Sequence, residues 1–336
     1  MKFGLIGCGG IGELRAAALS QMPQHRLVAV NDLDPARAAA LAAHTGATAV
    51  SNWQELVARD DLDVVVVSTP PQLHAEMSIA ALAAGKHVLC EKPLARSVAE
   101  CAQMVAAAEA NGRFLATGFN YRFYPSMLKA RELFDAGLIG ELDHIRSYTG
   151  YSATAHDQAW LHDAAIMGGG ALRDNGIHLI DLTCYFLGDV AAVQGMAGNA
   201  VWQFPGCEDN GFALIRSRAG KIASLQASWT EWRGYRLSVE LVGSRGMIRA
   251  TCFPMSVQAT WADARGGKTQ RKVEVFPRDQ VMEKVKSYRW AVTESFVKEF
   301  DALETAVLGL PSPIATGQDG LTAIHVAETA AAEINN

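Results

Sequence analysis

The sequence predicts an α/β protein of two domains, an N-terminal doubly wound parallel sheet and a C-terminal α/β domain built on a mostly antiparallel sheet. Three observations predict this fold. Strand-like and helix-like segments alternate through the first 120 residues, as in a parallel sheet covered by helices. Beyond Gly188, strand-like runs follow one another across short turns, which is typical of antiparallel sheets. The length of 336 residues also fits two domains of ordinary size.

The N-terminal strands are predicted from apolar runs that stop at turn residues. The run DVVVVS is continuous and β-branched, which is typical of a strand buried on both faces. The intervening helices are rich in Ala and Leu, and they end where Pro23 or Gly85 follows. In chain order we expect strand Lys2–Ile6, helix Ile11–Met22, strand Arg26–Asn31, helix Pro35–His44, strand Asp63–Ser68, helix Leu73–Ala84, strand His87–Cys90, helix Val98–Ala110 and strand Phe114–Thr117.

The second half begins with a helix predicted to end at Gly137. Turn sequences such as RAGK and GSRG then separate the strand-like runs. The expected elements are helix Tyr124–Ala136, strands Phe212–Ser217, Ile222–Trp229, Arg236–Val242 and Met247–Thr251, and helices Trp290–Leu308 and Gly320–Ile334. We therefore expect domains at 1–120 and 121–310, with a C-terminal helix at 311–336 packing back toward the first domain.

The composition narrows the function classes. Apolar residues make up 49% and charged residues 19%, with a net charge of −5 and no run of Lys and Arg, so nucleic acid is not expected as a partner. No apolar run approaches the ~18 residues of a membrane helix, and the N-terminus does not resemble a signal peptide. The six cysteines form no C-x-x-C pair, as expected of buried thiols in a reducing compartment. These features predict a cytoplasmic protein that does not bind membranes.

The first chemical motif is G-x-G-x-x-G between the first strand and the first helix. Gly7 allows the tight turn, Gly9 lets the backbone approach a pyrophosphate, and Gly12 allows close helix–strand packing. Unpaired N–H groups at the start of the following helix favour phosphates. The motif in this context predicts a Rossmann dinucleotide site, with contacts from Gly7, Gly9, Gly10, Ile11 and Gly12.

An acidic residue at the end of the second strand predicts which dinucleotide binds. Asp32 lies 20 residues after Gly12, where a carboxylate accepts hydrogen bonds from the adenosine ribose. Leu33 follows, and no adjacent Arg is placed to bind a 2′-phosphate. NAD is therefore predicted rather than NADP, with Asp32 and Leu33 beside the ribose.

The segment Cys90–Leu94 follows the fifth expected strand, at the sheet edge where open α/β folds bind ligands. Lys92 is therefore expected to face the nicotinamide, on a backbone restricted by Pro93. A surface ion pair between Lys92 and Glu91 is the alternative.

A second segment, Gly168–Asp181, holds three glycines before a helix. Asp174 and His178 are four residues apart and are expected on one helix face, where the carboxylate orients a histidine base. Asp181 lies one turn further on. The alternative is a capped helix with a structural histidine.

The residues just upstream of Gly168 do not by themselves indicate one function. Trp160 can stack on a sugar face or pack in a core, and the sequence leaves both open. The pairs His156–Asp157 and His162–Asp163 match no familiar zinc spacing, so no metal is expected.

Together these motifs resemble the Gfo/Idh/MocA oxidoreductases, which include glucose–fructose oxidoreductase and inositol dehydrogenase. The likeness rests on GCGGIG at 7–12, STPPQLH at 68–74, CEKPLA at 90–95, GFNYRFYP at 118–125 and GGGALRDNGIHLIDL at 168–182. It implies a large open C-terminal sheet that often mediates oligomerisation, so a homodimer or homotetramer is expected. It also implies further cofactor contacts from Ser68, Thr69, Pro70, His74, Glu91 and Lys92, and substrate contacts from Lys92, Asn120, Tyr121, Arg122, Asp174 and His178. Trp160 joins the candidate substrate contacts because its ring can stack on a sugar face.

The expected activity is NAD-dependent hydride transfer between a sugar or polyol hydroxyl, such as that of an inositol, and the nicotinamide. His178 removes the hydroxyl proton with Asp174 beside it, and Lys92 stabilises the alkoxide. Two alternatives stay open: an NAD-dependent glycosidase that oxidises its sugar transiently, and a non-catalytic NAD-sensing regulator on the same fold.

Overall fold

The computed structural model describes residues 1–153, 159–264 and 266–332. The chain divides into two compact units. The first unit comprises Met1–Asn120 and Lys286–Leu321, and the second comprises Tyr121–Val285 and Thr322–Asn336. The predicted fold class, a parallel N-terminal sheet followed by a mostly antiparallel C-terminal sheet, is confirmed.

In the described part of the first unit, six strands form a parallel sheet in the order β3-β2-β1-β4-β5-β6. The order reverses between β1 and β4, and this is where open α/β sheets bind their ligands. The strands are β1 (Lys2–Ile6), β2 (Arg26–Asn31), β3 (Thr48–Ala49), β4 (Val64–Val67), β5 (His87–Cys90) and β6 (Leu115–Thr117). Every residue of the β4 run VVVV is buried, as its continuous apolar sequence predicted.

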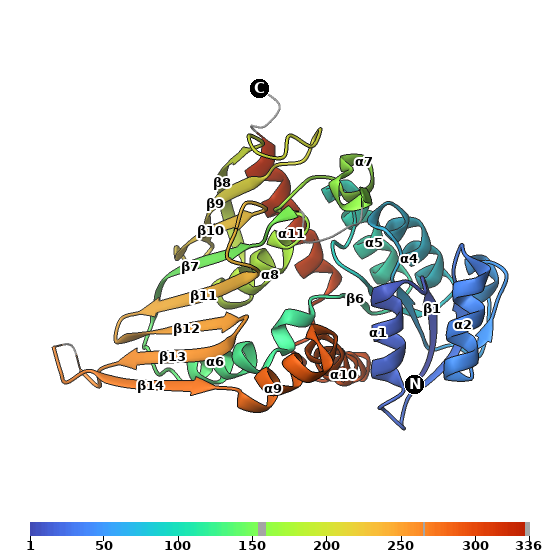
Figure 1. The fold of residues 1–336 in the computed structure, drawn as a ribbon, viewed down its shortest axis with the longest axis horizontal. Coiled ribbons are helices and arrows are strands. Elements are labelled where there is room, and N and C mark those ends of the chain that lie inside the picture. The colour runs from blue at the N-terminus through green and yellow to red at the C-terminus, as the bar shows by residue number, and fades with distance from the viewer. Residues whose placement is uncertain (154–158, 265, 333–336) are drawn as a thin grey trace. The chain divides into compact units, whose positions relative to one another are not determined.

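Helices alternate with these strands along the chain (Figure 1). They are α1 (Gly10–Leu19), α2 (Pro35–Thr45), α3 (Trp53–Val57), α4 (His74–Ala83) and α5 (Val98–Ala110). A late helix, α10 (Tyr288–Val307), packs against α1 in the same unit. The ring of Phe300 meets Phe3 edge-on at 5.3 Å, and Glu299 pairs with Arg15.

The unit boundaries differ from the expected domains at the C-terminal end. The sequence placed 121–310 in the second domain, whereas residues 286–321 pack with the first unit. The difference arises because residues far apart in the chain pair with one another. Thr117, at the end of β6, donates its backbone N–H to the Ala315 carbonyl at 2.9 Å. Helix α11 (Gly317–Ala331) begins in the first unit and continues into the second.

The second unit is built on a larger sheet, and in its described residues eight strands run in the order β14-β13-β12-β11-β7-β10-β9-β8. Figure 1 shows them from β8 at the top to β14 at the bottom. Among the described strands of this second sheet, only β7 and β10 pair in parallel, and the remaining neighbours are antiparallel. The strands are β7 (Leu142–Gly150), β8 (Val190–Gly198), β9 (Asn210–Ser217), β10 (Ile222–Ser228), β11 (Arg236–Gly243), β12 (Gly246–Cys252), β13 (Met255–Trp261) and β14 (Gln270–Val275).

Among the described residues, helices pack on one face of this sheet, and apolar side chains on its other face are exposed. Helix α6 (Pro125–Asp135) packs on β12 and β13, and α8 (Gly176–Leu187) packs on β7, β10 and β11. Along β9, Ala213 and Ile215 are buried, whereas Phe212 and Leu214 are 47% and 54% exposed. Shorter helices α7 (Ala164–Met167) and α9 (Pro277–Lys286) lie in the connections.

The sequence predicted strands at β9–β12 but none at β7, β8, β13 or β14. Strand β14 lies at the edge of the sheet and carries the sequence QRKVEV, which lacks a continuous apolar run. Such polar edge strands acquire their conformation from the neighbouring strand and discourage further pairing. Here that neighbour is β13, whose residues 256–261 pair with 270–275.

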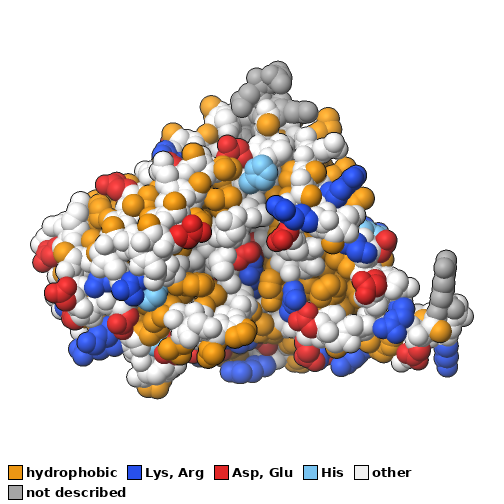
Figure 2. Space-filling view, turned by 180° about the vertical axis from the view of Figure 1, so that it is seen from behind, with side chains coloured by type: hydrophobic (Ala, Val, Ile, Leu, Met, Phe, Trp, Pro, Cys, Tyr) orange, Lys and Arg blue, Asp and Glu red, His pale blue; other side chains and the backbone are white. Residues whose placement is uncertain are grey.

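On the face that Figure 2 shows, charges of the two signs are mixed rather than gathered by sign. Figure 2 shows Lys and Arg side chains interspersed with Asp and Glu side chains on the face in view. In the part of the chain that the structure describes, no helix is both long and apolar enough to cross a membrane.

Candidate functional site

The glycine-rich turn joins β1 to α1 in the first unit. Gly7 has a φ of +96°, which favours glycine, and a Cβ on Gly12 would lie 2.0 Å from the Gly7 carbonyl oxygen. A Cβ on Gly9 or Gly10, in contrast, would meet nothing within 4 Å. The turn is thus tightly packed at Gly7 and Gly12 and leaves free space at Gly9 and Gly10, where a dinucleotide could approach. No side chain caps the start of α1, so its first N–H groups can bind a phosphate.

Asp32 follows β2 beside this turn. Its Oδ2 accepts a hydrogen bond from the Cys8 amide at 2.7 Å, and its Oδ1 accepts one from the Asp34 amide at 2.9 Å. The carboxylate is therefore fixed next to the turn, where it suits ribose hydroxyls and repels a 2′-phosphate. Leu33 beside it is exposed. The open glycines, the uncapped helix start and this carboxylate fit NAD.

Two further loops of the first unit follow β4 and β5, which are adjacent parallel strands. Ser68, Thr69 and Pro70 follow β4 and are partly exposed. His74, the first residue of α4, is fully buried. Its Nε2 lies 2.7 Å from the Thr69 carbonyl oxygen and its Nδ1 lies 2.9 Å from that of Pro93. Burial lowers the pKa of His74.

Lys92 follows β5 and is partly exposed, between two buried neighbours. Glu91 Oε1 pairs with the guanidinium of Arg15 on α1 at 2.6 Å, and Arg15 also pairs with Glu299 of α10. The Lys92 amide lies 3.3 Å from Glu91 Oε2, as donor to that oxygen. Glu91, which the alternative interpretation paired with Lys92 at the surface, is buried and forms an ion pair with Arg15.

Asp174 and His178, four residues apart in the chain, are both buried in the second unit. Asp174 precedes α8 rather than lying within it, because the helix begins at Gly176. Its carboxylate accepts hydrogen bonds from the Tyr151 hydroxyl and from Trp229 Nε1, the latter at 3.1 Å. Burial and the Asp174 charge raise the pKa of Tyr151, so its hydroxyl stays protonated as a donor.

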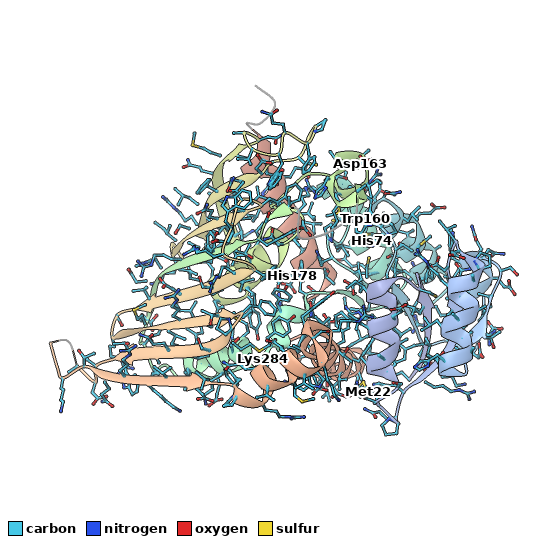
Figure 3. All side chains as sticks on the ribbon, in the orientation of Figure 1. Met22, His74, Trp160, Asp163, His178 and Lys284 are labelled. Atoms are coloured by element: carbon cyan, nitrogen blue, oxygen red, sulfur yellow. The ribbon has the colours of Figure 1, made fainter. Side chains whose placement is uncertain are left out.

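The His178 ring is oriented by an aromatic neighbour. Tyr121 stacks on it with ring centroids 4.0 Å apart and planes 5° from parallel. The Tyr121 hydroxyl lies 3.1 Å from that of Tyr235, which fixes the far side of the stack. Figure 3 labels His178 on α8 within the second unit. A buried histidine whose ring plane is set by stacking is suited to proton transfer.

The neighbouring residues that were expected to bind substrate have protein partners. Arg122 forms a bidentate, buried ion pair with Asp181, with Nε to Oδ2 at 2.9 Å and Nη2 to Oδ1 at 2.5 Å. Asn120, which ends the first segment of the first unit, donates to the Ser295 hydroxyl at 2.8 Å. These contacts hold both side chains in place.

The segment just upstream of the triple-glycine turn supplies less evidence about function. Trp160 is partly exposed in a short 3-10 helix, Ala159–His162, and Figure 3 labels it together with Asp163. The His162 ring stacks on Phe204 at 4.2 Å. His156 and Asp157 lie outside the described residues. Within the described ranges, no three His, Cys, Asp or Glu side chains cluster as metal ligands do.

Sequence reasoning missed Glu208, which organises the triple-glycine turn. Its two carboxylate oxygens accept the Gly170 amide at 2.8 Å and the Leu172 amide at 2.7 Å. A Cβ on Gly170 would lie 2.3 Å from the Glu208 carbonyl oxygen, so glycine is required there. Glu208 is buried, and burial raises its pKa. In the sequence, only the position of Glu208 just before β9 could have drawn attention to it. Tyr151 and Trp229 belong to no sequence pattern that predicts their contact with Asp174.

Comparison with known families and proteins agrees with this geometry. Residues 1–119 match the model of an oxidoreductase family with an NAD-binding Rossmann fold, and residues 127–249 match the GFO/IDH/MocA C-terminal domain. Inositol 2-dehydrogenase of Rhizobium meliloti strain 1021 is 30% identical over 339 residues, which cover 98% of this chain and 96% of that protein. Levoglucosan dehydrogenase of Pseudarthrobacter phenanthrenivorans is 28% identical over 309 residues, covering 80% and 79%.

Solved structures resemble the chain over nearly its whole length. GenD2 from gentamicin A biosynthesis, in complex with NAD, aligns with a TM-score of 0.81 at 29% identity, covering 99% of this chain and 94% of that one. Levoglucosan dehydrogenase in complex with NADH and levoglucosan aligns with a TM-score of 0.85 at 25% identity, covering 98% and 97%.

Proposed function

Because the chain belongs to the Gfo/Idh/MocA oxidoreductase family, we propose that it oxidises one secondary or anomeric hydroxyl of an inositol-like polyol or a sugar. The family and the relatives named inositol 2-dehydrogenase and levoglucosan dehydrogenase already make it an NAD-dependent dehydrogenase of a sugar or polyol. The observations that support the finer proposal are the buried Asp174 carboxylate, which accepts hydrogen bonds from Tyr151 and Trp229, and the buried His178 ring four residues further on, which stacks on Tyr121.

His178 is the proposed general base. The Tyr121 stack sets its ring plane, and the nearby Asp174 charge favours the imidazolium that forms when it accepts the hydroxyl proton. Hydrogen bonds from Tyr151 and Trp229 hold the Asp174 carboxylate in place. A positioned base of this kind contributes on the order of 10²–10⁴ in rate.

Lys92 is the proposed electrostatic partner. An ammonium donor lowers the energy of the alkoxide character that develops as the hydroxyl proton leaves. The residues around it hold its backbone, since Glu91 is fixed by Arg15. The open glycines, the start of α1 and Asp32 would hold NAD, which supplies the hydride acceptor when bound.

The test begins with the purified protein and NAD, and separately NADP, against a panel of inositols, aldoses and glycosides, with reduced cofactor followed by absorbance. We expect reduction of NAD by one polyol or sugar class and little reduction of NADP. Cleavage of a glycoside without accumulation of NADH would instead identify the glycosidase. Binding of NAD with no turnover of any compound would favour the regulator.

Variants then test the residue roles. Lys92→Ala and His178→Ala should each lower kcat on the true substrate by roughly 10²-fold or more while NAD still binds. Exposed counterparts, Lys268→Ala and His44→Ala, are matched controls and should be neutral. Near-full kcat in Lys92→Ala or His178→Ala would remove that residue from the mechanism.

The open face of the second unit's sheet supports a homo-oligomer. Met196 on β8 is 68% exposed and pairs in register with Phe212 on β9, which is 47% exposed. An apolar strip of this kind on a sheet face is suited to a second copy of the chain. Light scattering should give a dimer or tetramer mass, and Phe212→Lys should shift it to the monomer.

A further inference from the structure

The segment just before β9 carries a buried acidic side chain that the proposed chemistry does not use. Glu208 is 1% exposed, and its carboxylate accepts the amides of Gly170 and Leu172 in the triple-glycine turn, residues 168–174. Burial raises the pKa of Glu208, whereas these two hydrogen bonds and the charge of Arg173 oppose that rise. A buried charge is costly unless hydrogen bonds replace its lost water, so a carboxylate at this position requires a reason.

The turn explains why the residue is a carboxylate. Each of its two oxygens receives one backbone N–H, at 2.8 Å from Gly170 and 2.7 Å from Leu172. The amide between them, that of Ala171, donates to the Glu208 carbonyl oxygen at 2.9 Å. Three successive amides thus bind one residue, and converging backbone N–H groups of this kind favour an anion. A Gln at this position would offer only one accepting oxygen and would turn its NH2 group toward the other donor.

The turn that Glu208 binds leads directly into Asp174. The Asp174 amide donates to the carbonyl oxygen of Gly170 at 3.0 Å, so Asp174 is bonded to the first residue that Glu208 holds. The Asp174 carboxylate in turn accepts hydrogen bonds from the Tyr151 hydroxyl and from Trp229 Nε1. A shift of the turn would therefore displace this carboxylate from its two donors.

The Trp229 donor is bonded to the same segment before β9. Its backbone amide donates to the carbonyl oxygen of Asp209, the residue after Glu208, at 2.7 Å. Two consecutive residues therefore hold the turn that carries Asp174 and the backbone of one of its donors. The contact is close, because a Cβ on Gly170 would lie 2.3 Å from the Glu208 carbonyl oxygen and 2.5 Å from its amide nitrogen.

Resting on the proposed role of Asp174, we propose that Glu208 is a positioning residue that acts on the reaction through Asp174. By binding three successive amides of the triple-glycine turn, it fixes the Asp174 carboxylate against the Tyr151 and Trp229 donors. A displacement of about 1 Å in a reacting group can cost on the order of 10²-fold in rate. The residues that would hold NAD lie in the first unit, so loss of Glu208 should lower kcat and leave the Kd for NAD unchanged.

Two substitutions disturb the contact from opposite sides. Glu208→Gln keeps the size of the side chain but places an NH2 group against one amide of the turn, so we expect kcat to fall about tenfold. Gly170→Ala adds a Cβ that must move the turn away from the Glu208 backbone, so we expect a similar fall. Gly198→Ala is the matched control in the same unit, because its Cβ would meet nothing within 4 Å, and it should keep the kcat of the wild type.

A double-variant cycle separates positioning from general stabilisation. Asp174→Asn removes the charge that Glu208 positions, so adding Glu208→Gln to it should cause no further loss of kcat, since residues that act as a unit are not additive. Thr183→Val is the control for lost stability, because it removes buried hydrogen bonds of the Thr183 hydroxyl to Ser147 and Leu179 in the same unit. It should lower Tm and keep kcat.

The measurements are steady-state kcat with saturating NAD, NAD titration by calorimetry, and thermal unfolding of every variant. Losses of kcat that add in the double variant, or a kcat that falls with Tm in Thr183→Val as well, would make Glu208 a stabilising core residue and overturn the positioning role.

Asp174→Asn by itself distinguishes the positioning role from the function on which it rests. If Asp174→Asn lowers kcat while Glu208→Gln and Gly170→Ala leave it unchanged, the positioning role is wrong and the proposed mechanism stands. If Asp174→Asn keeps full kcat on a sugar or polyol that the wild type oxidises, the role of Asp174 is wrong, and the positioning role of Glu208 is overturned with it.

Discussion

The buried pair of Arg122 and Asp181 gives the sharpest test of side-chain role. The sequence suggested Arg122 as a substrate ligand, whereas the structure pairs it with Asp181 through two parallel hydrogen bonds of 2.9 and 2.5 Å. The two side chains are 5% and 2% exposed, and the guanidinium lies 4.5 Å from the centroid of the Tyr185 ring. If the pair is structural, removing one partner should destabilise the second unit.

The magnitude follows from burial. Breaking a buried ion pair by removing one partner costs about 3–5 kcal/mol, because the remaining charge stays buried without compensation. For a unit of roughly 150–250 residues, each kcal/mol lowers Tm by about 2–4 °C. Asp181→Leu or Arg122→Met should therefore lower the Tm of the second unit by roughly 6–20 °C. The double variant removes both charges and should recover most of that loss.

Scanning calorimetry of the wild type, both single variants and the double variant measures this coupling. Asp135→Ala is the control, since its i,i+4 pair with Arg131 is largely exposed and should change stability by at most about 0.5 kcal/mol. The reasoning fails if Arg122→Met keeps the wild-type Tm and only raises KM for the polyol. That result would indicate that Arg122 contacts the substrate.

Three other predictions follow from the described contacts. Gly9→Ala should keep the Tm of the protein without NAD, since its Cβ meets nothing within 4 Å, but it should weaken NAD binding about tenfold or more. Gly12→Ala should lose both stability and NAD binding, because its Cβ would lie 2.0 Å from a carbonyl oxygen. The His87 ring accepts a backbone N–H at 2.9 Å, and burial lowers its pKa. The unfolded chain therefore binds the proton more readily, so the unfolding free energy should fall as pH drops below ~6.5, by at most about 1.4 kcal/mol per pH unit. His87→Gln should flatten that slope. Trp229→Phe removes the indole donor of Asp174 and should lower kcat about tenfold with NAD affinity unchanged.

Each of these has a contrary outcome that calorimetry or kinetics would reveal. Equal NAD affinity in Gly9→Ala and the wild type would mean that the turn does not face the pyrophosphate. An unchanged pH slope in His87→Gln would assign the proton uptake to another group. A full kcat in Trp229→Phe, with its Tm retained, would mean that Tyr151 alone holds the Asp174 carboxylate.

The sequence by itself determined the features that depend on neighbours in the chain. The dinucleotide turn could be predicted because Gly7, Gly9 and Gly12 act within one strand–turn–helix, and Asp32 follows at a fixed spacing. The buried run Val64–Val67 predicted its strand for the same reason, since one continuous apolar segment requires burial on both faces. The resemblance to one family rested on such local motifs and is confirmed.

The tertiary structure decided which side chains from distant parts of the chain meet. Glu299 joins α10 to the first unit by pairing with Arg15, which is 284 residues away in the chain. Charged and hydroxyl side chains have no periodicity that names their partner, so Arg122, Glu208 and Tyr151 could not be assigned from spacing. The same holds for His74, whose place between two carbonyls exists only because β4 and β5 lie side by side.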